Sequence, residues 1–231
     1  MIKISNPFKG FVCKYVPQGH VTQFLYENVE LYKSVNIGLT KGHSGIDIVF
    51  PWGTPIYAVE GGLVVEVKND AGGFGKHIRI YSDNDDKKGG REWTYGHNSQ
   101  NYVKVGDIVV AGQHIADVGN TGFVVSSIED NALGYWDRGG NKHNGTHLHL
   151  QVREFRYSKN GWSYYPNTPK VTILNYHNGL LGCVDFSKWF QDAPYGDTQI
   201  LKGEATKKYA SDDPVWWANF LNLLKFLRNN P

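Results

Sequence analysis

Short runs of β-branched and aromatic residues, cut at close intervals by glycine, constrain the fold of this chain most strongly. Between Ile46 and Ile80 these runs read GIDIVF, PIYAVEGGLVVEV and KHIRIY, with glycine-containing turn signals between them. Runs of this length and composition, bounded by glycine, are typical of β-strands. The 27 glycines among 231 residues also suit a turn-rich β protein better than a helical one. We therefore expect a mainly β domain built from an antiparallel sheet.

The same pattern of strand-like runs separated by glycine-containing turns continues to about residue 166, with one interruption. REWTYGH, the run YVKVGDIVVAGQHIADVGNTG and the long run THLHLQVREFRYS all read as strands with glycine turns, and Asn160–Gly161 predicts a hairpin turn. Residues 123–144 are polar and glycine-rich, so we interpret them as an inserted loop. This loop precedes the last strand and could form one wall of a binding groove or be a tolerated surface insertion.

The pattern changes after Pro166. Residues 167–231 are rich in aromatic residues, and Pro214 stands at the first position of a predicted helix over about 214–228. We expect one domain over residues 1–166, with its motif-bearing core at 40–166, and a C-terminal extension over 167–231. The extension is expected to pack its apolar face on the core. Its aromatic residues could instead mediate association with a cell wall or a virion.

Bulk composition excludes several classes of protein. A net charge of +2 does not suit a nucleic-acid-binding protein, and no stretch approaches the roughly 20 apolar residues of a transmembrane segment. The amino terminus, MIKISNPFKGFV, lacks the apolar segment of a standard signal peptide. Cys13 and Cys183 form no metal motif, and we expect two buried thiols rather than a disulfide.

Histidine and aspartate residues at two places could together hold a metal. In THLHLQV, strand alternation sends His147 and His149 to one face, while Leu148 points to the core. In GHSGIDIVF, Asp47 faces away from the apolar side of its strand, and His43 can fold back toward it. A histidine, an aspartate and a second histidine are a ligand set that suits zinc, with a fourth position open for water.

The order of motifs along the chain resembles one known family. The chain contains, in this order, GHSGIDIVFPWGTPIYAVEGGLVVEV, GGFGKHIRI, WTYGHN, VKVGDIVVAGQHIADVGNTG and GTHLHLQVRE. These segments resemble the lysostaphin/LytM-type zinc metalloendopeptidases, which hydrolyse peptidoglycan, and the resemblance covers about residues 40–166. It implies a lysostaphin-type fold, sandwich-like and built on a duplicated hybrid motif, with a narrow groove over the metal.

The resemblance also implies roles for individual residues. His43, Asp47 and His149 become the ligands of one Zn²⁺ ion, and His97 and His147 become unliganded catalytic histidines. The implied reaction is hydrolysis of an amide bond in peptidoglycan cross-links or stem peptides by metal-activated water. With no standard signal peptide, a wall-cleaving chain suggests a phage lysis enzyme or a virion-associated wall hydrolase.

Two other functions fit the resemblance less well. A non-catalytic LytM-like regulator typically lacks metal ligands, whereas all five site residues are present here. A structural phage tail component that binds cell wall is the other alternative. The motifs leave open which peptide bond would be cut and which of His97 and His147 acts as the general base.

Overall fold

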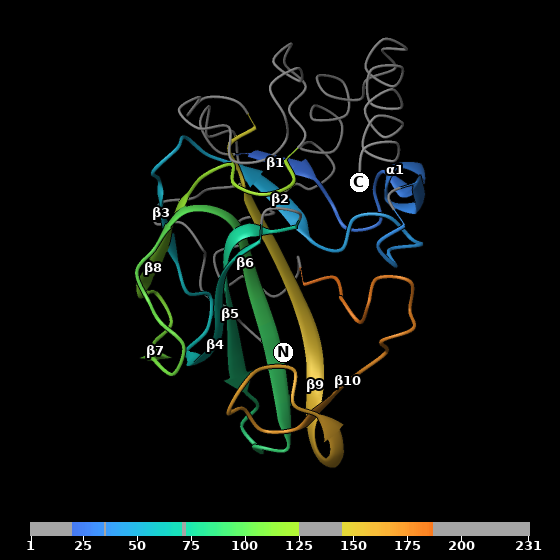
Figure 1. Cartoon of the computed structure of the whole chain (residues 1–231), viewed down its shortest axis with the longest axis vertical. Coiled ribbons are helices and arrows are strands. Elements are labelled where there is room, and N and C mark those ends of the chain that lie inside the picture. Colours follow the sequence, from blue (N-terminus) through green and yellow to red (C-terminus); the bar gives the residue numbers. More distant parts are fainter. Residues whose placement is uncertain (1–19, 35, 71–72, 125–144, 187–231) are drawn as a thin grey trace.

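A computed structural model of the chain describes residues 20–34, 36–70, 73–124 and 145–186. Within these ranges the chain forms one short helix, α1 (Val29–Ser34), and a single sheet of ten strands (Figure 1). The strands are β1 (His20–Gln23), β2 (Ile46–Val49), β3 (Pro55–Tyr57), β4 (Gly62–Asp70), β5 (Gly75–Asp83), β6 (Gly89–Asn101), β7 (Ile108–Val109), β8 (His114–Val118), β9 (Leu148–Trp162) and β10 (Val171–Ile173).

The strands pair antiparallel throughout the described residues, in the order β1-β2-β9-β6-β5-β4-β7, with β10 on β9 and β8 joining β3 to β6. The two longest strands, β6 and β9, run side by side through the middle of the molecule (Figure 1). This architecture confirms the prediction of a mainly β, antiparallel fold.

Alternation along β9 separates the core from the opposite face of the sheet. Leu148, Leu150 and Val152 are fully buried in the main hydrophobic cluster, together with Trp93 and Tyr95 of β6. Because successive side chains of a strand point to opposite faces, the residues between them project to the other side. The intervening positions carry histidine, glutamine and arginine, so this second face of β9 is polar.

The segment that follows residue 166 begins on the sheet. Strand β10 pairs with β9 in the register Val171↔Tyr157. A two-residue turn at Asn160–Gly161 was expected, but β9 continues to Trp162. A Cβ on Gly161 would lie 2.4 Å from the Val171 carbonyl oxygen, so the strand bends closely over β10 at this glycine.

Several predictions fall outside the described residues. These are the helix over 214–228, most of the loop over 123–144 and Cys13, and the division into 1–166 and 167–231 stays a prediction. Cys183 is buried and its thiol is free. Burial raises the pKa of this thiol to about 12, which makes it unreactive.

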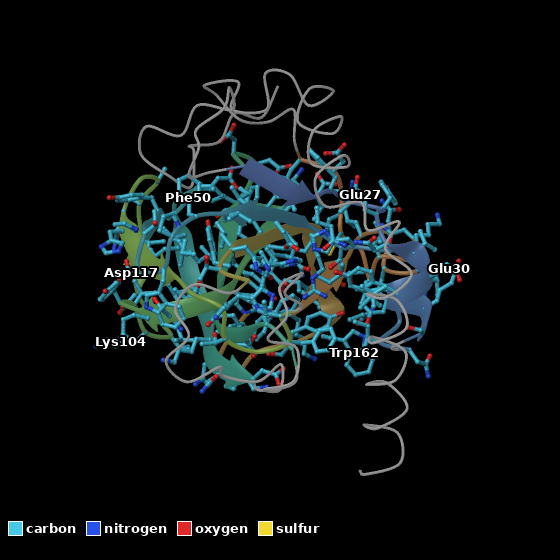
Figure 2. The ribbon with its side chains drawn as sticks, turned by 90° about the horizontal axis from the view of Figure 1, so that it is seen from above. Glu27, Glu30, Phe50, Lys104, Asp117 and Trp162 are labelled. Carbon is cyan, nitrogen blue, oxygen red and sulfur yellow. The ribbon has the colours of Figure 1, made fainter. Side chains whose placement is uncertain are left out.

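Charged side chains lie at the rim of the molecule when it is seen from above. Glu30 of α1 points outward on one side, and Lys104 and Asp117 lie on the other (Figure 2). None of the helices among the described residues has the length and apolar character needed to cross a membrane.

Candidate metal centre

Three side chains, two from neighbouring strands and one from the turn before β2, converge on one point. His43 Nε2 lies 3.0 Å from His149 Nδ1 and 3.2 Å from Asp47 Oδ1. His149 Nδ1 lies 3.0 Å from the same carboxylate oxygen. Among the described residues this is the group whose spacing could hold a metal ion. The structure therefore brings together the three residues that the sequence predicted as ligands.

Backbone pairing positions two of these side chains. Asp47 of β2 lies directly opposite His149 of β9 in the sheet, and directly opposed residues present their side chains on the same face. His43 reaches the same place through a turn that packs against β9. A Cβ on Gly45 would lie 2.5 Å from the Leu150 carbonyl oxygen, so only glycine allows this approach.

Hydrogen bonds on the outer side of the two imidazoles orient their inner nitrogens. His43 Nδ1 donates to the Phe24 carbonyl oxygen at 3.3 Å, and His149 Nε2 donates to Gln151 Oε1 at 3.1 Å. Ser44 Oγ also donates to Gln151 Oε1, at 2.8 Å. Each neutral imidazole then carries its proton on the outer nitrogen and presents a lone pair inward.

The donor set fits zinc. Two imidazole lone pairs and a carboxylate oxygen face one another at 3.0–3.2 Å, and a bound cation satisfies all three. In a tetrahedral zinc site with bonds of about 2.1 Å, ligand atoms are about 3.4 Å apart. The outer hydrogen bonds to carbonyl-type oxygens are those that metal-ligating histidines make. We conclude that the residues present fit one zinc ion with a fourth position left over.

Two further histidines lie beside the three candidate ligands. His147 Nδ1 donates to the Gly145 carbonyl oxygen at 2.7 Å, and its Nε2 lies 3.7 Å from Asp47 Oδ2. His97 Nδ1 donates to the Thr121 carbonyl oxygen at 2.7 Å. The rings of His97 and His147 are 4.7 Å apart. Both residues therefore leave Nε2 without its proton, as a proton acceptor next to the candidate metal position.

The backbone of His97 is held in an unusual conformation. Its φ is +63°, in the left-handed region that non-glycine residues rarely adopt. Its amide N–H donates to the Phe74 carbonyl oxygen at 2.7 Å, and the Phe74 ring also packs against His149, with centroids 5.1 Å apart. This strained conformation turns the imidazole of His97 toward the other histidines.

Burial and charge act on the protonation of these groups. Burial alone would raise the pKa of Asp47, but His43 and His147 beside it hold the pKa well below its ordinary value. Burial lowers the pKa of His149, although contact with Asp47 opposes this. Burial, reinforced by His147, holds the pKa of His97 well below its usual range. The carboxylate of Asp47 is thus ionised and the imidazole of His149 is neutral at pH 7, the forms that bind a metal, and the neighbouring imidazole of His97 is neutral as well.

A cavity of about 300 Å³ adjoins two of the three candidate ligands on the polar face of the sheet. Its wall includes His43 and His149 at one end and Arg79 and Arg153 further along. The two arginines share Glu92, which is fully buried: Arg153 Nε donates to Glu92 Oε1 at 2.9 Å and Arg79 Nη1 to the same oxygen at 3.2 Å. The site therefore opens into a space lined by uncharged and cationic groups.

Sequence reasoning missed the residues that support the ligands. Gln151 and Ser44 hold His149 in orientation; both stand within the segments that carry the resemblance, but no role was predicted for either. Strand alternation offered one signal, because Gln151 stands two positions after His149 on the same face. His77 is buried, and its Nε2 lies 3.0 Å from Glu66 Oε2.

Comparison with known families agrees with this geometry. The model of Peptidase family M23 matches residues 41–166, more than half of the chain and the part that contains all five histidine and aspartate site residues. The chain belongs to peptidase family M23. The predicted likeness to lysostaphin-type peptidases is thereby confirmed at the level of the family.

Curated relatives match only part of the chain. It is 44% identical over 80 residues to the uncharacterized lipoprotein YgeR of Escherichia coli, covering 35% of the chain and 30% of the relative. It is 37% identical over 107 residues to lysostaphin of Staphylococcus staphylolyticus, covering 45% and 22%. The glycyl-glycine endopeptidase ALE-1 of Staphylococcus capitis is 35% identical over 118 residues, covering 50% and 32%. The chain thus spans about a third or less of these relatives.

Proposed function

We propose that this M23 peptidase is a zinc-dependent endopeptidase that hydrolyses amide bonds in the peptide part of peptidoglycan. The observation that carries the proposal is the convergence of His43, Asp47 and His149 within 3.0–3.2 Å, with two proton-accepting histidines beside them. The likeness to lysostaphin and to a glycyl-glycine endopeptidase supports the choice of a peptide substrate.

His43, Asp47 and His149 would hold the zinc. When bound, zinc supplies a Lewis acid that polarises a carbonyl and makes water nucleophilic near neutral pH. The carboxylate of Asp47 lowers the charge of the site, and the hydrogen bonds from His43 to Phe24 and from His149 to Gln151 keep both imidazoles in the binding tautomer.

His97 and His147 would transfer the proton from the attacking water to the leaving amine. Each imidazole has its Nδ1 proton committed to a backbone carbonyl, so Nε2 is free to accept a proton from the attacking water. The same nitrogen can then return the proton to the leaving amine, as general acid catalysis requires. Burial keeps His97 neutral at pH 7 and ready to act as a base. We propose that the two residues share these roles, and single variants of each would separate them.

The test uses purified sacculi of different chemotypes. Wild-type protein with one equivalent of zinc is expected to release soluble peptide fragments, which mass spectrometry identifies together with the bond that was cut. A chelator, or the variant Asp47→Ala, is expected to abolish release, because one ligand of the metal is lost. Asp86→Ala, in an exposed loop, is the control and is expected to cleave normally. Absence of fragments from every sacculus, with zinc present, would refute the proposal.

The biological setting belongs to the same proposal. We propose a role in lysis or penetration of a cell wall, with a phage lysis protein or virion-associated protein as the predicted context. Detection of the chain in purified particles, and loss of wall penetration by particles carrying Asp47→Ala, would test that context. Presence of all five site residues in one cluster does not favour a non-catalytic regulator.

A further inference from the structure

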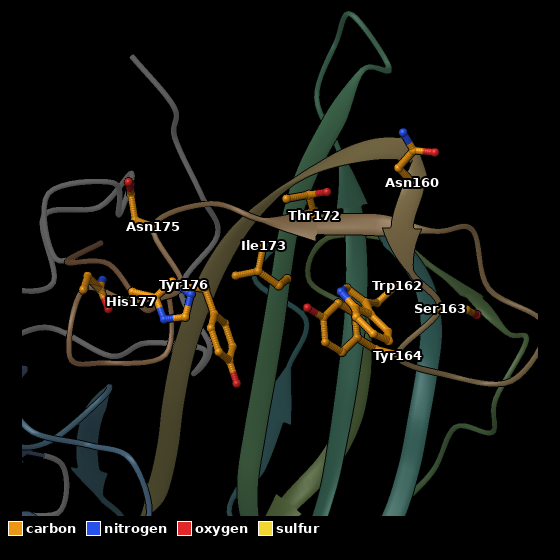
Figure 3. Close-up of a pocket in the computed structure, with 10 residues that line it drawn as sticks. Asn160, Trp162, Ser163, Tyr164, Thr172, Ile173, Asn175, Tyr176 and His177 are labelled. Carbon is orange, nitrogen blue, oxygen red and sulfur yellow. The ribbon is translucent and has the colours of Figure 1, made fainter.

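A second hollow lies on the β9–β10 side of the sheet, apart from the candidate metal centre. It has a volume of about 1080 Å³ and is formed by the end of β9, by β10 and by the segments that follow each of them. Figure 3 shows Trp162 and Tyr164 gathered on one side of Ile173, and Tyr176 and His177 on the other. Aromatic rings therefore line both sides of this hollow.

The aromatic side chains in this hollow are unusually exposed. Trp162 is 73% exposed, Tyr164 40% and Tyr176 39%. Three of the five exposed aromatic side chains among the described residues thus gather in one place. Exposed large aromatic surface costs free energy in water, and its concentration in one concavity is typical of a binding site.

Apart from the imidazole of His177, the polar side chains that line the hollow are amides and hydroxyls. Its wall contains no lysine, arginine, aspartate or glutamate, but includes Asn160, Asn175 and Thr172. Within the described ranges, the side chains of these three residues are exposed and make no hydrogen bond or ion pair. Free amides and hydroxyls can donate and accept hydrogen bonds together, which matches a ligand rich in hydroxyl and acetamido groups.

We propose that this hollow binds an uncharged oligosaccharide, and that it holds the glycan strand to which the peptide substrate is attached. Flat aromatic faces pack against the C–H faces of sugar rings, and uncharged amides pair with their hydroxyls. The absence of charged side chains from the wall disfavours an anionic ligand. The open shape and large volume suit a chain of several sugars rather than one small molecule.

One side chain, that of Arg153, lies beside both the hollow and the cavity next to the candidate metal ligands. The Arg153 guanidinium carbon lies 5.9 Å from the centre of the Tyr164 ring, and Arg153 also lines the cavity that contains His149. Arg153 follows His149 by four residues on β9, which corresponds to about 13 Å of extended strand. A glycan at Tyr164 would therefore be several extended peptide residues from the bond to be cut, as in a peptide attached to a sugar.

This inference rests on the proposed function only in its choice of saccharide, and its binding test needs no metal and no hydrolysis. The probe is an oligomer of four β-1,4-linked N-acetylglucosamine units, titrated calorimetrically into chelator-treated protein. Wild type is expected to bind it. Trp162→Ala is expected to weaken binding at least tenfold, and Trp162→Phe is expected to retain most of it, since the aromatic face is kept.

Tyr102→Ala is the matched control, because Tyr102 is also an exposed aromatic residue (54%) but lies outside the hollow. It is expected to bind the oligomer as wild type does. A second measurement uses the zinc-loaded protein and compares cleavage of glycan-linked with glycan-free peptide. Trp162→Ala is expected to lower the ratio of the two rates. Absence of saccharide binding by the wild type, or equal binding by Trp162→Ala, would overturn the inference even if hydrolysis is confirmed.

Discussion

Replacement of Gln151 by leucine tests how much of the metal affinity comes from outside the ligand set. Gln151 is buried, and its Oε1 accepts hydrogen bonds from His149 Nε2 at 3.1 Å and from Ser44 Oγ at 2.8 Å. Leucine fills a similar volume but accepts no hydrogen bond, so His149 loses the partner that fixes its tautomer and ring orientation. Loss of such a partner typically costs about 10- to 100-fold in metal affinity, or about 1.4 to 2.8 kcal/mol.

The measurement is competition for zinc against a chromophoric chelator of known affinity, at pH 7. Gln151→Glu is the matched variant, because it keeps an acceptor oxygen at the same position and is expected to bind zinc at least as tightly as wild type. Ser44→Ala removes the hydrogen bond that orients the Gln151 amide but keeps the acceptor for His149, so a smaller loss of zinc affinity is expected. Thermal unfolding of each metal-free variant shows whether the fold is intact. Zinc affinity of a folded Gln151→Leu within threefold of wild type would refute this reasoning.

Three other substitutions give independent tests. His147→Ala is expected to keep one equivalent of zinc by elemental analysis while sacculus cleavage falls by about 10²- to 10⁴-fold, as loss of a proton-transfer group predicts; full activity would contradict the assignment. Glu92→Gln leaves the buried Arg153 guanidinium without its anion, while Arg79 keeps its contact with Glu66, so urea unfolding should show a loss of about 3 to 5 kcal/mol, and a loss below about 1 kcal/mol would be inconsistent with this. Burial alone would raise the pKa of Glu66, but His77 and Arg79 hold it below its ordinary 4.5. Its ionised form therefore stabilises the fold above pH 4.5, and the difference in unfolding free energy between wild type and Glu66→Gln should shrink as pH falls below that value, whereas a difference independent of pH would argue against the ion pairs.

Local patterns were enough to predict most of the strands, and together with the family resemblance they predicted the candidate ligands. Alternation of apolar residues along GIDIVF and THLHLQV reports which side chains share a face, and it placed Asp47 and His149 away from the core before their pairing was known. The antiparallel pairing of β2 with β9 then brings these two residues opposite each other. Glycine at position 45 completes the arrangement, since His43 can reach the site only through a turn with no side chain there.

Features that depend on register or on distant segments were not predictable from those patterns. The support that Gln151 gives to His149 requires the Ser44 hydroxyl from another part of the chain. The hollow around Trp162 and Tyr176 forms only because β10 returns onto β9, and no spacing in the sequence reports that return. The sequence predicted a hairpin turn at Gly161, where the strand in fact bends and continues. The asparagine–glycine pair does not distinguish the two, because it is compatible with both.

The pairing of β2 with β9 has a consequence for how the protein is made. Asp47 and His149 are 102 positions apart, and β2 lies between β1 and β9 in the sheet. During synthesis, β2 leaves the ribosome long before the strand that it needs as a neighbour, and such long-range pairing is slow. The nascent chain therefore carries no complete metal centre until the last of the long strands has joined the sheet. The zinc ion that we propose for this site can therefore bind only after β9 has paired with β2, late in the folding of the chain.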